Sequence, residues 1–327
     1  MRLFVTGASG YIGRALCRRL AAAGHEVRAL VRSSSRTQPL AEAGVSLFPG
    51  DVTDRASMRE GMSGADLVVH AAADLDLAGP SERMEAVNVG GSENVASLAS
   101  KLGVPRLLSI GSVACWGGSP EDGTPAVEDT PVLAPPTRYS ATKRRGDEAV
   151  RAWGRRGLEV LTVHPSLVYG PPGKKEGANA LLRQLDLGRF PALIGADRRT
   201  SWIFLDDLIE GLVRVLERGR PGGVWLMTGD VASVAEVAAR VAAAGGAPVP
   251  RWRLAVGPAR LALRLATPFY RLRGRRPPIP LEQLESLSRH WCFDDRRARA
   301  EFDWQPRGLD QGLPPTLAHL RAGRDPG

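Results

Sequence analysis

Short apolar runs alternate with amphipathic segments through the first half of the chain. Strands are predicted over residues 3–5, 25–32, 45–48, 66–73 and 106–110, and helices are predicted over residues 82–102 and 139–156. Strands that alternate with helices are typical of a parallel sheet covered by helices on both faces. The pattern therefore predicts an α/β fold built on a doubly wound parallel sheet.

A glycine-rich stretch, from Thr6 to Gly13, joins the first apolar run to a helical pattern through Leu16 and Leu20. Glycines in such a turn bring backbone N–H groups close to a pyrophosphate, and the helix N-terminus adds partial positive charge. Gly-rich turns also simply end strands, but the position directly after a strand favours dinucleotide binding. The stretch predicts a Rossmann-type domain whose cofactor-binding residues include Gly7, Ser9, Gly10, Tyr11, Ile12 and Gly13.

The end of the second predicted strand bears on the choice of cofactor. In this kind of βαβ unit an acidic residue there binds the ribose of NAD, whereas an arginine accommodates the 2′-phosphate of NADP. Val31 is followed by Arg32 and carries no carboxylate. The sequence therefore favours NADP(H), with NAD(H) as the alternative if Arg32 is only a solvated surface arginine.

Two later strand ends are candidates for contact with the same dinucleotide. Asp51 follows the third strand, where its carboxylate would meet the adenine amine or would serve only as a turn residue. Ala71, Ala72 and Ala73 follow the fourth strand, and their small side chains permit close approach of the backbone to a cofactor. His70, just before them, is expected to be packed or hydrogen-bonded rather than catalytic.

Composition excludes several classes of protein. The chain has 327 residues, 43% of them hydrophobic, with no run of eighteen apolar residues and no signal-peptide pattern at its start, so we expect a cytoplasmic location. Cys17, Cys115 and Cys292 lie far apart and near no histidine cluster, so we expect neither a disulfide framework nor a metal site.

The net charge of +9 is concentrated in one segment. Eight arginines and no acidic residue fall between Arg251 and Arg276, and without them the chain carries only +1. That distribution argues against nucleic-acid binding. Leucines and aromatic residues interleave with these arginines, so the segment is a mouth for apolar or anionic substrates, a shallow membrane contact, or a helix packed over the substrate domain. Packing is favoured, because Pro258 and Pro268 are expected to interrupt a long helix.

Tyr139 and Lys143 are the strongest candidates for chemistry. Residues four apart share one face of a helix, and an adjacent ammonium favours phenolate, which lowers the pKa of a tyrosine. Lysine is scarce in this chain, with only four residues, so its use here is informative. Ser112, at the end of the fifth strand, would hydrogen-bond a substrate oxygen held near Tyr139. The alternative is a plain surface pair.

The chain resembles the extended short-chain dehydrogenase/reductase family, within the NAD(P)-dependent epimerase/dehydratase superfamily. The resemblance rests on three motifs in the same order along the chain: the glycine motif, the strand-end serine and Tyr-x-x-x-Lys. The likeness extends to residues 50–54, 88–92, 164–171 and 202–208, and to the tail from Phe293. The resemblance implies that Ser112, Tyr139 and Lys143 are catalytic and that the enzyme is a homodimer. It also implies that the remaining cofactor contacts are Asp51, Val52, Ala71, Ala72, Ala73, Asn88, Pro165, Ser166, Leu167 and Val168.

Within that family the chain is most similar to the dihydroflavonol reductase and 3β-hydroxysteroid dehydrogenase branch. Sugar-nucleotide enzymes usually carry an arginine where this chain has Thr200, with Arg199 one place earlier. We therefore expect an NADP(H)-dependent enzyme that interconverts a carbonyl and a secondary alcohol on a small, relatively apolar molecule. The alternatives are a sugar-nucleotide epimerase or dehydratase with retained NAD, and a non-catalytic cofactor-binding subunit.

The resemblance also predicts how the chain is divided. Residues 1–165 are expected to form the NADP-binding domain and residues 166–327 mainly a smaller substrate-binding domain. Residues 200–230 are expected to return to the Rossmann core.

Overall fold

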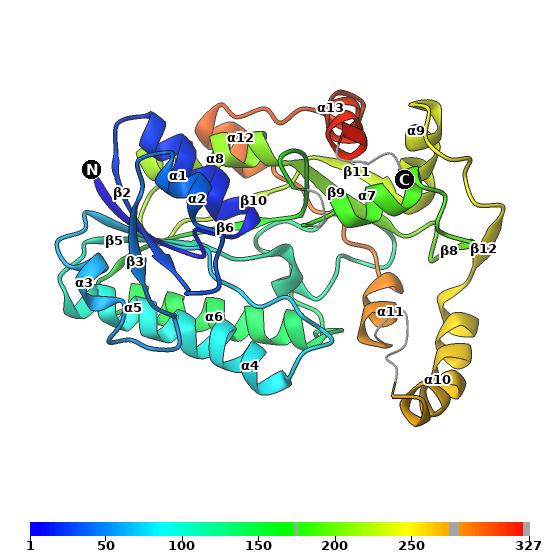
Figure 1. Cartoon of the computed structure of the whole chain (residues 1–327), viewed down its shortest axis with the longest axis horizontal. Helices are drawn as coiled ribbons and strands as arrows, with labels where there is room; N and C mark the ends of the chain where they lie inside the picture. Colours follow the sequence, from blue (N-terminus) through cyan, green and yellow to red (C-terminus); the bar gives the residue numbers. More distant parts are fainter. Residues whose placement is uncertain (174–175, 275–280, 323–327) are drawn as a thin grey trace.

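A parallel sheet forms the centre of the molecule in the computed structural model, which describes residues 1–173, 176–274 and 281–322 (Figure 1). Seven strands pair in the order β10-β6-β5-β4-β1-β2-β3, and every pairing is parallel. They are β1 (Arg2–Thr6), β2 (Glu26–Val31), β3 (Ser46–Pro49), β4 (Leu67–His70), β5 (Arg106–Ile110), β6 (Glu159–Pro165) and β10 (Val224–Met227). The prediction of a doubly wound Rossmann-type sheet is confirmed.

Helices cover both faces of this sheet (Figure 1). One face is covered by α1 (Tyr11–Ala22), α2 (Gln38–Ala41), α8 (Leu205–Arg218) and α12 (Arg296–Phe302), and the other by α3 (Arg59–Met62), α4 (Ser81–Glu85), α5 (Gly91–Lys101) and α6 (Arg138–Gly154). Leu16, Leu208 and Phe302 are buried in the first of these layers, and Leu98 and Val150 in the second. Burial on both faces explains why the strands read as continuous apolar runs.

The long helix expected over residues 82–102 contains a widened turn. The π-helical segment η1 (Ala86–Gly90) lies between α4 and α5. Two glycines lie within this region, and close packing explains only one of them. A Cβ on Gly91 would lie 2.8 Å from Cγ2 of Val52, whereas a Cβ on Gly90 would meet nothing within 4 Å.

A second group of elements packs beside the sheet, around its own apolar cluster. It contains the sheet β11-β9-β7 and the strand pair β12-β8. Its strands are β7 (Leu167–Tyr169), β8 (Ala192–Ile194), β9 (Arg199–Phe204), β11 (Asp230–Ser233) and β12 (Trp252–Leu254), and its helices α7 (Asn179–Asp186), α9 (Val234–Ala243) and α13 (Leu309–Ala322). Leu182, Trp202 and Leu313 are buried among them. After β9, the chain enters α8 and β10 of the main sheet before it returns to β11.

Two helices extend away from the sheet (Figure 1): α10 (Val256–Leu272) packs against α11 (Leu281–Leu287). The expectation that prolines interrupt this segment is wrong. Pro258 lies in the first turn, where a backbone N–H has no helical partner, and the helix continues through Pro268. Across the described residues, no helix combines the length and the apolar character needed to cross a bilayer.

Substitution of Gly146 on α6 tests how closely the backbones of α6 and η1 pack beside the sheet. A Cβ at this position would lie 2.2 Å from the backbone oxygen of Asn88 in η1. We expect Gly146→Ala to lower the free energy of unfolding by about 1–3 kcal/mol, because the helix must move away. Urea unfolding measures this.

Gly154→Ala is the control in the same helix, since its Cβ would lie 3.4 Å from the nearest atom, Cγ2 of Val160. Alanine is the better helix former, so this variant should not lose stability. Equal losses in the two variants would contradict the packing argument.

Candidate functional site

A cavity of about 820 Å³ lies at the carboxyl ends of the parallel strands, where ligands bind in open α/β sheets. Most of the residues expected from sequence line it. They are Gly7, Ser9, Gly10, Tyr11, Ile12, Gly13, Arg32, Asp51, Val52, Ala71, Ala72, Ala73, Ser112, Tyr139, Pro165, Ser166, Leu167 and Val168. Asn88 and Lys143 are buried outside its wall.

The glycine loop has the geometry of a phosphate site. Gly7 adopts φ +68°, and a Cβ there would lie 2.5 Å from the backbone carbon of Ala71. A Cβ on Gly13 would lie 2.2 Å from the backbone oxygen of Gly7. The N-cap residue of α1 is Gly10, no side chain caps the helix, and its first turn contains no acidic residue. The N-terminal N–H groups of α1 therefore suit the pyrophosphate of a dinucleotide.

Tyr11 fastens this loop to the second group of elements. Its hydroxyl donates to the backbone oxygen of Gly170 and lies 3.3 Å from Nδ2 of Asn179. Nδ2 of Asn179 also donates to the oxygen of Gly173, at 2.7 Å. Tyr11 thus lines the cavity, and its hydroxyl is bonded to other parts of the protein. We therefore assign Tyr11 the role of holding the cavity wall together.

At the end of β2, two serines and Arg32 converge on the cavity. Oγ of Ser9 donates to Oγ of Ser35 at 3.2 Å, and the backbone N–H of Arg32 donates to the same Oγ at 3.2 Å. All three residues line the cavity. Ser35 was not singled out from sequence, although it belongs to the Ser-Ser-Ser-Arg run directly after Arg32.

Asp51 lies in the cavity wall and also bonds within a turn, so its position is compatible with both roles considered from the sequence, a contact with adenine and a turn residue. It lines the cavity, and its Oδ1 accepts from the backbone N–H of Thr53 at 2.9 Å and from the Thr53 hydroxyl at 2.8 Å. The turn contacts orient the carboxylate, and they do not remove it from the cavity wall.

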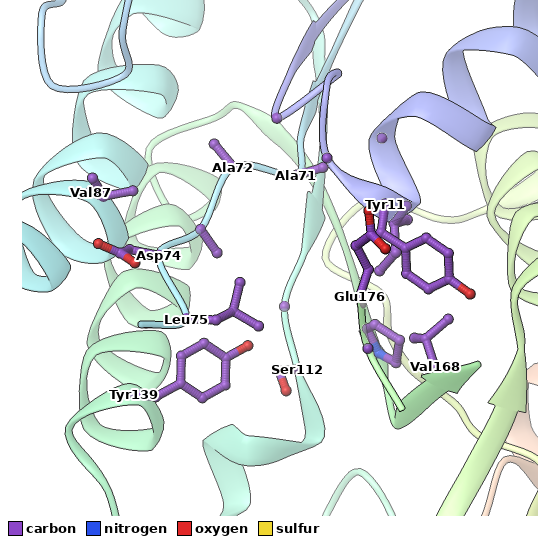
Figure 2. A pocket seen from close by; sticks show the side chains of 18 of the residues that line it. Tyr11, Ala71, Ala72, Asp74, Leu75, Val87, Ser112, Tyr139, Val168 and Glu176 are labelled. Carbon is purple, nitrogen blue, oxygen red and sulfur yellow. The ribbon is translucent and has the colours of Figure 1, made fainter. Parts of the chain in front are cut away.

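Ser112 and Tyr139 face each other across one end of the cavity, with Leu75 beside the ring of Tyr139 (Figure 2). Ser112 caps the 3-10 helix η2 (Val113–Trp116), and its Oγ accepts from the backbone N–H of Ala114 at 3.1 Å. Because Oγ accepts there, its hydroxyl proton is free to donate to an oxygen in the cavity. Tyr139 lies in the first turn of α6.

The protonation of Tyr139 differs from the sequence-based expectation. We expected Lys143 to lower the pKa of Tyr139. Burial instead raises the pKa of Tyr139 to about 12, although a hydrogen bond with Ser112 acts in the opposite direction. The phenol is therefore protonated at neutral pH and is an acid, because water no longer stabilises the phenolate.

Lys143 lies behind the cavity wall. Its Nζ donates to the backbone oxygen of Ile110, the last residue of β5, at 3.2 Å. Burial lowers the pKa of Lys143, and the acidic groups of Cys115 and Asp147 act against that shift. This contact ties α6 to the strand that leads into Ser112.

Asn88 holds the cavity wall from behind. Its Oδ1 accepts from the backbone N–H of Asp74 at 2.7 Å, and its Nδ2 donates to the Asp74 oxygen and to Oγ1 of Thr142, both at 3.0 Å. These bonds fix the segment that carries Leu75 relative to the helix that carries Tyr139. The side chain therefore positions the wall from behind and is not part of the cavity lining, whereas the resemblance had implied that Asn88 contacts the cofactor.

Two buried histidines support the same strand ends. His70 lies 2.8 Å from Oγ1 of Thr6 and 3.1 Å from Oγ of Ser92, and burial lowers its pKa to about 3. It is packed and hydrogen-bonded, as expected. Nδ1 of His164 accepts from the backbone N–H of Ser112 at 3.1 Å, and burial lowers the pKa of His164. Both rings are neutral, so they orient the backbone without adding charge.

Several residues of the cavity wall were not predicted from the sequence to be site residues, although Thr200 was noted there as a departure from the sugar-nucleotide enzymes. Thr200 on β9 and Trp291 form an isolated bridge, and both line the cavity. Leu75 and Glu176 also line it, and Figure 2 shows Glu176 beside Tyr11. These residues come from loops and from segments distant in sequence, whose positions local patterns do not reveal.

Comparisons with known proteins agree with this geometry. A sequence model described as the NAD dependent epimerase/dehydratase family matches residues 3–227. The 4-hydroxy-2-methyl-3-oxo-4-farnesyl-3,4-dihydroquinoline-1-oxide ketoreductase of Stigmatella aurantiaca is 31% identical over 236 residues, 70% of this chain and 68% of that protein. A dTDP-glucose 4,6-dehydratase of Mycobacterium tuberculosis is 30% identical over 244 residues, 70% and 73% of the two chains. The crystal structure of gox2253 superposes with a TM-score of 0.84 at 28% identity and covers 98% of both chains.

The protonation of Tyr139 is directly measurable. With the pKa raised to about 12, the protonated form persists as pH rises, and its ionisation should begin only above about pH 10. Ultraviolet absorbance of phenolate, recorded during a pH titration of wild type and Tyr139→Phe, measures this. A phenolate signal below pH 10 that disappears in the variant would show that Lys143 does lower this pKa.

Proposed function

Because the chain belongs to the NAD dependent epimerase/dehydratase family and is an NAD(P)-dependent oxidoreductase of the extended short-chain dehydrogenase/reductase type, we propose that it reduces a carbonyl to a secondary alcohol, or the reverse, with NADP(H). The observation that carries the proposal is the placement of Ser112 and protonated Tyr139 in one cavity with the glycine loop. When bound, NADPH supplies the hydride for the carbonyl carbon.

The residues of this chain provide the proton and hold the oxygen. The carbonyl oxygen accepts hydrogen bonds from the Ser112 hydroxyl and from Tyr139, and these donors stabilise the negative charge that develops on it. Tyr139 transfers its phenolic proton to that oxygen as general acid. The Nζ of Lys143, held near the end of β5 by Ile110, provides positive charge on the same helix as the phenolate that remains.

Preference for NADP(H) rests on the end of β2. Arg32, Ser9 and Ser35 border the cavity there. Oxygens of a 2′-phosphate would accept from the Arg32 guanidinium and from the Ser35 hydroxyl, whose oxygen already accepts from Ser9, whereas the ribose hydroxyl of NAD would meet no carboxylate at this strand end.

The substrate is a relatively apolar molecule. Near Ser112 and Tyr139 the cavity wall includes Leu75, Val113 and Trp291. The related ketoreductase is named for a substrate that carries a farnesyl group, and an apolar wall suits such a molecule because burial of its hydrocarbon is favourable.

A sugar-nucleotide epimerase or dehydratase is the second candidate, favoured by the likeness to dTDP-glucose 4,6-dehydratase. Such an enzyme needs a cation for the diphosphate of its substrate. Thr200 lines the cavity and Arg199 does not, and Arg83, which also lines it, is paired with Asp74 at 3.2 Å. Release of bound NAD on denaturation, together with binding of a nucleoside diphosphate sugar, would support this candidate instead.

The role of Tyr139 as general acid is tested by Tyr139→Phe, which removes only the hydroxyl. We expect kcat for NADPH-dependent ketone reduction to fall about a hundredfold or more, with the Kd for NADPH changed less than about twofold. Tyr270→Phe, on α10 and outside the cavity wall, is the matched control and should retain full turnover. Wild-type turnover by Tyr139→Phe would overturn the mechanism.

The cofactor preference is tested by Arg32→Ala. Loss of a charged hydrogen-bond donor to the 2′-phosphate should raise the Kd for NADPH about tenfold or more and leave the Kd for NADH unchanged. Arg36→Ala removes an exposed arginine of the same loop that does not line the cavity, and should change neither constant. Equal affinities of wild type for NADH and NADPH would refute the preference.

A further inference from the structure

The outer face of α10 is apolar and exposed. Leu261, Leu265, Phe269 and Leu272 are spaced four, four and three residues apart, which places them on one side of the helix. Their exposed fractions are 61%, 73%, 54% and 86%. We call these four residues the α10 stripe. A contiguous exposed apolar stripe on a helix marks an interaction surface.

The helix is already anchored on its opposite side. Arg260 on α10 pairs with Glu285 on α11, with its Nη1 3.1 Å from Oε1, and the two helices pack together. The stripe is therefore not the face that holds the helix on the protein. Figure 1 shows α10 at the extremity of the molecule, away from the central sheet.

The segment from 251 to 276, which includes the stripe, contains eight arginines and no acidic residue. Arg264 pairs with no acidic residue in the part of the chain that the structure describes. Arg273, just after the helix, lies 4.0 Å from the centre of the Phe269 ring. Its guanidinium is thus held beside the apolar stripe.

We propose that α10 docks on an anionic lipid membrane, with the α10 stripe in the acyl boundary and its arginines against the phosphates. Apolar residues on one face and arginines beside them are the pattern of helices that lie in the plane of a membrane interface. The continuity of the helix through Pro268 removes the reason for which the sequence favoured packing alone.

A second copy of this chain fits the same stripe less well. Two α10 helices in contact would bring Arg264 and Arg273 of each copy close to those of the other, with no acidic residue from the segment to neutralise them. Anionic lipid offers the complementary charge, so charge decides between the two occupants.

The docking helix is connected to the catalytic end of the cavity. On α11, Glu282 accepts from the backbone N–H of Arg138 at 2.9 Å and from Nε of Arg138 at 2.7 Å. Arg138 directly precedes Tyr139 at the start of α6. A membrane held by α10 would therefore be linked, through α11, to the start of the helix that carries Tyr139. The docking itself does not depend on the reaction proposed above.

Sedimentation of the full chain with lipid vesicles tests the proposal without any measurement of activity. We expect binding to vesicles of phosphatidylcholine mixed with phosphatidylglycerol, weak binding to phosphatidylcholine alone, and loss of binding as salt rises. Leu265→Ser should weaken binding about tenfold or more, and Arg264→Ala about fivefold. Thermal unfolding checks that the variants are folded, which we expect because the substituted side chains are exposed.

Two control variants match these changes elsewhere on the surface. Val132→Ser alters another exposed apolar side chain, and Arg18→Ala alters another exposed arginine on a helix. Both should bind as wild type does. Absence of binding to anionic vesicles at low salt would overturn the proposal, as would equal binding by Leu265→Ser and wild type. A wild-type dimer in vesicle-free solution that Leu265→Ser converts to a monomer would also overturn it, in favour of a second copy.

Discussion

The close approach of backbones around the cavity is the constraint on which the site depends. The loop at Gly7 lies against the backbone that follows β4, and only a residue without a Cβ leaves room for Ala71 there. Gly111, at the next strand end, leaves room in the same way for a side chain, since a Cβ there would lie 2.3 Å from Nδ1 of the His164 ring. Gly146 repeats the close approach of backbones between α6 and η1. These glycines allow neighbouring segments of the chain to pack closely around the strand ends. The cavity is the space that is left between those segments.

This packing explains why Tyr139 holds its proton. Tyr139 lies in the cavity wall among protein atoms, and the burial of its phenol raises the pKa more than the hydrogen bond with Ser112 lowers it. Lys143 lies on the same helix, but its Nζ binds the oxygen of Ile110 and its own pKa is lowered by burial. A protonated phenol is the form that the proposed carbonyl reduction requires of its general acid.

Local patterns in the sequence were sufficient for the sheet, the glycine loop and the helix of Tyr139. Each of these depends on residues close together in the chain, such as the glycines between β1 and α1. The substrate end of the cavity could not be predicted in this way. Trp291 reaches it only because its segment pairs with Thr200, about ninety residues away in sequence. The pKa of Tyr139 was predicted in the wrong direction, because the expectation counted the nearby charge and omitted burial.

The arginine-rich segment shows a different limit of sequence reasoning. Pro268 suggested an interruption, because an interior proline removes a backbone hydrogen bond, but α10 continues through Pro268 and packs against α11. Since α11 binds α10 through Glu285 and Arg138 through Glu282, any force that moves α10 also acts on the residue before Tyr139. The first turn of α6 is thereby linked to α10 through two ion pairs, Arg138–Glu282 and Arg260–Glu285. The proposed docking of α10 would therefore bring the membrane to a helix that is two contacts away from Tyr139, the proposed acid.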